Sequence, residues 1–143
     1  ELYKKSDVIS LHLPYNKNTH HLIDKKAFEK MKKGVLLINT ARGGLIDTEA
    51  LIQALDKKIV GGAGLDVLED ERVIAEEKQI LHDPNLKDRY EHLVLNHALL
   101  KKDNVVYTPH IAFYSKEALI RILDTTVENI FAFIEKKPSN VVN

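Results

Sequence analysis

Four short apolar stretches, each of strand length, alternate along the chain with polar loops and with segments of helical periodicity. The second stretch, Val35 to Ile38, carries apolar residues on both sides, which predicts a fully buried strand of a parallel sheet. Proline or a polar residue closes the stretches. The expected strands cover residues 8–13, 35–39, 61–67 and 104–108.

Segments with apolar residues three and four positions apart separate these strands and predict helices. The first helix is expected to end at Gly34, the second near residues 57–58, and a third is expected within residues 90–100. A long amphipathic helix follows the last strand. The residues able to cap helices through a side-chain oxygen are Asp24, then Asp47 or Thr48, and Ser115.

The alternation of strands and helices predicts an α/β fold. Parallel strands that follow one another need crossover connections, and these are right-handed. The sequence therefore predicts a parallel sheet of about four strands with flanking helices, followed by a long C-terminal helix.

Composition and charge favour a small-molecule ligand. The 143 residues carry 21 basic and 21 acidic side chains, so no basic footprint for nucleic acid or for an anionic membrane is expected. The chain has no cysteine, which excludes a disulfide framework and a thiolate metal site. Without a long apolar run or a signal-like start, a cytoplasmic location is the expectation.

Two polar side chains follow strands at the edge where parallel sheets bind ligands. Arg42 comes after the second strand, and its planar guanidinium suits a carboxylate, while Gly43 and Gly44 would let backbone and ligand approach. His110 follows the last strand and Pro109, and an imidazole exchanges a proton near neutral pH. Residue type alone leaves a surface salt bridge open for the arginine and a bystander role open for the histidine.

Four motifs stand in a fixed order along the chain: residues 2–14 with Thr19, Leu22 and Asp24 at their proper distances, residues 31–47, residues 64–71, and residues 108–114. In type and spacing they resemble the D-isomer-specific 2-hydroxyacid dehydrogenases. They are most similar to the D-lactate dehydrogenase-like branch of that family. The resemblance runs from Glu1 to Asn143.

The resemblance implies a Rossmann-like half with NAD as cofactor in residues 1–114, and a C-terminal helix and tail returning toward a substrate domain in residues 115–143. It implies reversible hydride transfer between NADH and a small 2-oxo acid of the pyruvate/D-lactate type. The family's Gly-x-Gly-x-x-Gly turn would precede Glu1, and these 143 residues contain no such turn. The isolated chain is therefore expected to be inactive.

Roles for individual residues also follow from the resemblance. Arg42 would bind the substrate carboxylate, His110 would be the acid/base, and Glu71 would orient His110, with Glu69 as the alternative in register. Residues expected at the cofactor are Leu13, Pro14, Thr19, Thr40, Ala41, Arg42 and Asp66, and residues expected in the substrate pocket are Arg42, Phe113 and Tyr114.

The alternative hypothesis for the function of the chain is a structural or interaction module. If no further strand flanks residues 8–13, this strand becomes an edge that invites pairing with a second copy or with a missing N-terminal half. A homo-oligomer is expected on this ground. A transcriptional corepressor with the same fold is a third reading that no residue favours. Surface or packing roles are assigned to His20, His21, His82, His92 and His97, and a structural role at a strand end is assigned to His12. No pair of these histidines has a convincing metal context.

Overall fold

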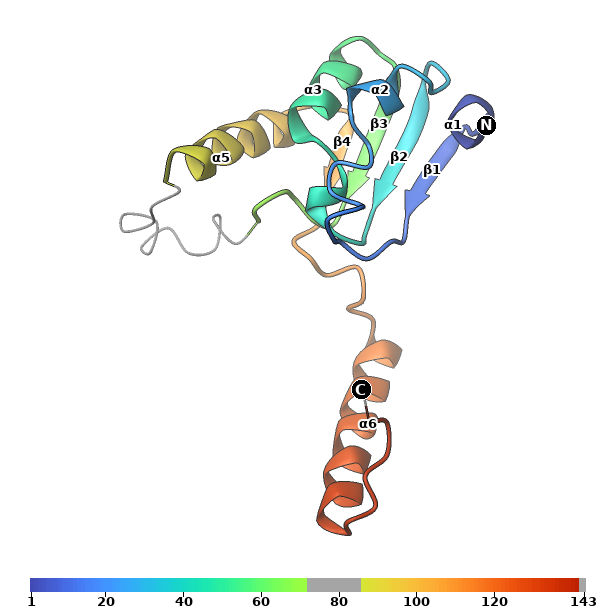
Figure 1. Ribbon diagram of the computed structural model, residues 1–143, viewed down its shortest axis with the longest axis vertical. Coiled ribbons are helices and arrows are strands. Elements are labelled where there is room, and N and C mark those ends of the chain that lie inside the picture. Colours follow the sequence, from blue (N-terminus) through green and yellow to red (C-terminus); the bar gives the residue numbers. More distant parts are fainter. Residues whose placement is uncertain (72–85, 142–143) are drawn as a thin grey trace. The chain divides into compact units, whose positions relative to one another are not determined.

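The computed structural model describes residues 1–71 and 86–141 (Figure 1). These residues form two compact units, Glu1–His110 and Ile111–Asn143. The first unit contains the sheet and the second contains the long helix. The domain boundary expected after residue 114 stays a prediction.

The first unit is built on one sheet of four parallel strands (Figure 1). Their order is β1 (Val8–Leu11), β2 (Val35–Asn39), β3 (Val60–Leu65) and β4 (Val105–Tyr107). The last residues of the strands pair across the sheet, Leu11 with Asn39, Asn39 with Leu65 and Leu65 with Tyr107. The carboxyl ends are therefore level, and the predicted parallel α/β fold is confirmed.

Two of the predicted caps fix the starts of helices in this unit. Asp24 accepts a hydrogen bond from the backbone N–H of Ala27 at 2.8 Å, at the start of α2 (Lys25–Phe28). Asp47, rather than Thr48, accepts from the N–H of Ala50 at 2.9 Å and begins α3 (Thr48–Asp56). The other helices that the structure describes in this unit are α1 (Leu2–Lys5), the 3-10 turn η1 (Gly43–Leu45) and α5 (Leu86–Leu100).

The first predicted helix ends earlier than its apolar pattern indicated. It stops at Phe28, well before Gly34. Gly34 instead has a φ of +85°, which places it in the turn that leads into β2, where a residue without Cβ adopts this conformation at no steric cost. The glycine thus serves the strand that follows rather than the end of the helix.

The core lies on one face of the sheet. In Figure 1, α2 and α3 cover that face, and α5 packs against α3 and β4. Burying these apolar side chains supplies the main driving force for folding of the unit. The largest fully buried apolar side chains of the described residues are Phe28, Ile23, Leu37, Leu45, Leu51, Leu99, Val35, Val60 and Val67.

The described helices of the first unit leave the opposite face of the sheet uncovered, which corrects the expectation for β2. Its side chains alternate between buried and exposed, and Leu36 is 45% exposed. Val8 on β1 and Val106 on β4 are 55% and 69% exposed. The prediction of a fully buried strand was wrong because the described helices of this unit bury only one face of the sheet.

The helix predicted within residues 90–100 is confirmed as part of α5, but a different stripe of it is buried. Asn96 and Leu99 are each 1% exposed, whereas Tyr90 and Val94 are exposed. The Asn96 amide donates a hydrogen bond to the backbone carbonyl of Glu69 at 2.8 Å. A polar residue therefore lies on the buried side of α5, and the spacing of apolar residues does not predict its burial.

The second unit contains α6 (Lys116–Ile134). The predicted cap Ser115 accepts a hydrogen bond from the N–H of Ala118 at 3.1 Å. Across the described part of the chain, no helix is both long and apolar enough to cross a membrane. The cytoplasmic location stays a prediction.

Candidate functional site

A cavity of about 800 Å³ opens where the carboxyl ends of the strands lie level. Arg42 follows β2, Glu71 lies six residues beyond the end of β3, and His110 follows β4. All three side chains line this cavity. The structure thus brings together the three residues that the sequence singled out for chemistry.

Asn39 holds the backbone that presents Arg42. This side chain is 1% exposed, its Oδ1 accepts from the N–H of Ala41 at 3.1 Å, and its Nδ2 donates to the carbonyl of Arg42 at 2.9 Å. The guanidinium is exposed, and its Nη1 donates to the carbonyl of Ala41 at 2.6 Å. The sequence analysis treated Asn39 only as the end of a strand. A polar residue that closes a buried strand can, however, indicate a side chain that hydrogen-bonds to the backbone of the following loop.

The two glycines after Arg42 are explained by packing inside the protein. A Cβ on Gly43 would lie 2.0 Å from the carbonyl oxygen of Leu68, and one on Gly44 would lie 2.6 Å from the ring of Tyr15. The sequence indicated close approach of a ligand at these positions. The structure shows close approach of other chain segments.

Gly43→Ala is therefore expected to destabilise the fold. The methyl group meets a backbone carbonyl, which cannot rotate away, and overpacking of this kind costs about 1–3 kcal/mol. Denaturant unfolding followed by circular dichroism measures the change. Gly64→Ala is the matched control, because its Cβ would meet only the terminal methyl of Ile38 at 3.0 Å. Equal stability of the two variants would contradict this account.

His110 and Glu71 form a hydrogen-bonded pair. Nδ1 of His110 lies 2.7 Å from Oε1 of Glu71, and Oε2 of Glu71 accepts from the N–H of Leu68 at 3.2 Å. His110 has a φ of +55°, and its backbone N–H donates to the carbonyl of Asp66 at 2.8 Å. The neighbouring Glu69 contacts other residues instead, so the geometry favours Glu71 as the partner of the histidine.

Asp66 links the loops at the ends of three strands. It is 3% exposed, its N–H donates to the carbonyl of Asn39 at 2.9 Å, and its Oδ1 accepts from the hydroxyl of Thr108 at 2.5 Å. Its expected contact with the nicotinamide carboxamide stays a prediction. Its position at the end of β3 is compatible with that role.

The acidic side chains of the site act on Tyr107, the last residue of β4. Burial raises the pKa of the Tyr107 phenol, and the nearby carboxylates of Glu71 and Asp66 raise it further. Negative potential therefore extends from these carboxylates into the end of the strand that leads to His110.

A second hollow, of about 480 Å³, lies beside Arg42 at the ends of β1 and β2. Five of the expected cofactor residues line it, namely Leu13, Pro14, Thr40, Ala41 and Arg42. Thr19 is used within its own loop: its hydroxyl donates to the carbonyl of Pro14 and accepts from the N–H of Asn16, both at 2.8 Å. Its contact with a cofactor stays a prediction.

Phe113 and Tyr114 belong to the second unit, where their rings meet edge to face with centroids 6.0 Å apart. Their expected place over the substrate stays a prediction. His82 lies outside the described residues.

Sequence reasoning gave no role at the site to several residues that line the cavity, among them Tyr15 and His20. Tyr15 and His20 line the same cavity as Arg42, and the Tyr15 hydroxyl lies 3.1 Å from Nδ1 of His20. Tyr15 follows Pro14 just beyond the first predicted strand, at the edge where ligands bind. This position could have indicated from the sequence that Tyr15 lies at the site.

A sheet of parallel strands whose carboxyl ends are level, with hollows opening at that edge, is typical of a Rossmann-like domain. Residues 1–112 match the sequence model of the D-isomer specific 2-hydroxyacid dehydrogenase, NAD binding domain. The chain belongs to this family.

Curated relatives agree with that assignment. The chain is 41% identical over 138 residues to a glycerate dehydrogenase of Methylorubrum extorquens, covering 96% of the chain and 38% of that protein. It is 42% identical over 130 residues to a D-lactate dehydrogenase of Escherichia coli, covering 90% of the chain and 37% of that protein.

A solved structure gives the same result for the fold. It is the crystal structure of D-lactate dehydrogenase from Aquifex aeolicus complexed with NAD and lactic acid. The match has a TM-score of 0.78 and 44% identity, and it covers 95% of this chain and 39% of that one. The chain thus spans about two-fifths of the length of these relatives.

Proposed function

We propose that this chain supplies the reacting side chains of a D-2-hydroxyacid dehydrogenase that reduces a small 2-oxo acid of the pyruvate type with NADH. The observation that carries the proposal is that Arg42 and the His110–Glu71 pair line one cavity at the strand ends. Membership of the family and the likeness to D-lactate dehydrogenases support it.

Arg42 binds the substrate carboxylate in this proposal. Its side chain is exposed in the cavity, and the hydrogen bond from Nη1 to the carbonyl of Ala41 fixes the guanidinium plane. A guanidinium offers two parallel N–H donors to a carboxylate, which sets both the position and the orientation of the substrate.

His110 exchanges the proton with the substrate oxygen. Among the described side chains, Glu71 is the hydrogen-bond partner of the ring, and it engages Nδ1. Nε2 is then the atom that donates a proton to the developing alkoxide and takes it back in the reverse direction. The carboxylate of Glu71 fixes the tautomer and stabilises the charged ring.

The residues at the second hollow fit one end of the cofactor. Leu13 and Pro14 offer an apolar wall, and the backbone at Thr40 and Ala41 offers polar groups beside Arg42. NADH, when bound, supplies the hydride. The glycine-rich turn that holds a pyrophosphate is not within these 143 residues, so the chain alone is expected to show no turnover.

The test compares two preparations. One is the chain alone, and the other is a chimera in which the 143 residues replace the matching segment of the Escherichia coli D-lactate dehydrogenase. We expect pyruvate-dependent oxidation of NADH by the chimera only. A folded chimera that binds NADH but reduces neither pyruvate nor other small 2-oxo acids would overturn the proposal, and turnover by the chain alone would show that it needs no further segment.

An interaction module remains a second candidate because β1 is an edge strand of the described sheet. The apolar face next to it, with Val8, Leu36 and Val106 exposed, adds surface for association with a second copy or with another polypeptide segment that supplies a further strand. Sedimentation equilibrium of the chain at high concentration tests this. Association is the expected result, and a strictly monomeric mass would count against the candidate.

A further inference from the structure

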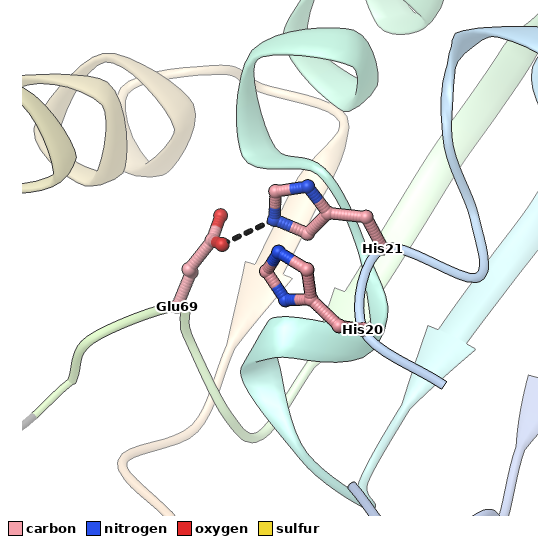
Figure 2. A group of neighbouring side chains, drawn as sticks. All are labelled: His20, His21 and Glu69. Carbon is pink, nitrogen blue, oxygen red and sulfur yellow. Dashed lines mark hydrogen bonds and ion pairs between the residues drawn. The ribbon is translucent and has the colours of Figure 1, made fainter. Parts of the chain in front are cut away.

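A second group of titratable side chains, apart from the His110–Glu71 pair, includes two residues that line the cavity, His20 and Glu69. Figure 2 shows His20 and His21, from the loop after β1, facing Glu69, from the loop after β3. Each offers one ligand atom, and these atoms all lie within 4.8 Å of one another. Two imidazoles and a carboxylate are a common ligand set for a transition-metal ion.

The carboxylate of this group is held in place from several sides. Glu69 is 7% exposed, its Oε2 accepts from the hydroxyl of Thr48 at 2.9 Å, and its backbone carbonyl accepts from the Asn96 amide at 2.8 Å. Its Oε1 lies 2.5 Å from Nε2 of His21. A buried carboxylate with a fixed second oxygen presents the first oxygen in a defined direction, as a metal ligand requires.

The two histidines are also oriented. Their rings stack with centroids 3.8 Å apart and planes 24° apart. Nδ1 of His20 lies 3.1 Å from the hydroxyl of Tyr15, which leaves Nε2 of that ring for a metal. A hydrogen bond to the other ring nitrogen is the usual arrangement for a metal-ligating histidine.

His92 on α5 is an independent sign that the group is incomplete. Its Nδ1 is buried without a hydrogen-bond partner among the described residues, and it lies 3.6 Å from Oε2 of Glu69. Its Nε2 lies 3.6 Å from Oδ2 of Asp70. These distances are too long for hydrogen bonds, and an unsatisfied buried nitrogen is costly.

We propose that His20, His21 and Glu69 bind a zinc ion, with His92 beside the site. Three protein ligands leave one coordination position open toward the cavity. Nitrogen ligands select zinc over magnesium, which prefers oxygen. The sequence offered no convincing metal context because Glu69 stands 48 residues from His21. The site goes beyond the proposed dehydrogenase function, since binding of the ion requires neither NADH nor a 2-oxo acid.

Isothermal titration of Zn²⁺ into the 143-residue chain tests the site. We expect one saturable site and no comparable binding of Mg²⁺. His20→Ala and Glu69→Gln should each weaken Zn²⁺ binding by at least about tenfold. His20 is exposed, so its truncation leaves the core intact, and Gln at position 69 keeps an oxygen for Thr48.

Two further variants are matched controls. His97→Ala removes an exposed histidine of α5, and His110→Gln removes the other histidine–glutamate pair of the cavity. Both should retain the affinity of the unmodified chain, and circular dichroism verifies that every variant is folded. Co²⁺ as a second probe should give the visible spectrum of a tetrahedral site. Absent saturation by Zn²⁺, or equal affinity in the His20→Ala and Glu69→Gln variants, would overturn the proposal.

Discussion

Replacing His110 by glutamine in the chimera lowers kcat for pyruvate reduction by about 10²–10⁴-fold, the range for loss of a general acid. The physical reason is that glutamine keeps the size and polarity of the side chain but has no proton to exchange at the position of Nε2. KM for pyruvate changes little, because the carboxylate is held by Arg42. Initial rates of NADH oxidation over a range of pyruvate concentrations measure both quantities.

His97→Gln is the matched control for this prediction, because His97 is an exposed histidine on α5. It should leave kcat unchanged. If His110→Gln retained kcat within about threefold of the unmodified chimera, the histidine would not be the acid, since even weak general acid catalysis contributes more than that.

Replacing Arg42 by glutamine should reduce kcat/KM for pyruvate by about two to three orders of magnitude. Losing one partner of a charged hydrogen-bonded pair costs about 2–5 kcal/mol, and each 1.4 kcal/mol is a factor of ten. Arg42→Lys keeps the charge but loses the planar fork, so its loss should be smaller and should appear mainly in KM.

NADH affinity separates this effect from damage to the cofactor site. Fluorescence titration should give a change in the Kd for NADH that is much smaller than the change in kcat/KM in both Arg42 variants, because Arg42 is one of several residues expected at the cofactor. Lys101→Gln, a change at an exposed residue after α5, is the control for removing a positive charge. Equal kcat/KM values for Arg42→Gln and Lys101→Gln would contradict the assignment of Arg42 as the carboxylate anchor.

The strands, the helix starts and the edge of the sheet that carries the candidate site were predictable because they depend on local patterns. Apolar runs closed by polar residues marked the strands, and Asp24, Asp47 and Ser115 marked helix starts. Parallel strands place their carboxyl ends at one edge, so residues following different strands meet there. Arg42 and His110 could be placed together on this rule alone.

What escaped prediction depends on contacts between distant segments. The exposure of Leu36 is set by which face of the sheet the helices cover, and a single strand's pattern does not contain that information. The partners of Glu69 stand 21 and 48 residues away, at Thr48 and His21. Asn96 is buried because its amide hydrogen-bonds to the backbone carbonyl of Glu69. A pattern of apolar residues does not predict that a polar residue lies there.

The local sequence also did not decide which of two nearby glutamates pairs with His110. Glu69 and Glu71 are alike in type and two positions apart, and only the path of the loop after β3 directs one toward His21 and the other toward His110. The resemblance to the family favoured Glu71, and the geometry agrees with that choice. Their catalytic or structural roles stay predictions that the variants above test.

The most direct test of the central claim is a crystal structure of the chimera with NADH and oxamate, an unreactive analogue of pyruvate. The account predicts the carboxylate of oxamate on the Arg42 guanidinium by two hydrogen bonds, and its carbonyl oxygen within about 2.6–3.2 Å of Nε2 of His110. His110 should keep its Nδ1 contact with Glu71. Oxamate bound away from Arg42, or with its carbonyl oxygen out of reach of His110, would contradict the claim that these residues form one reacting centre.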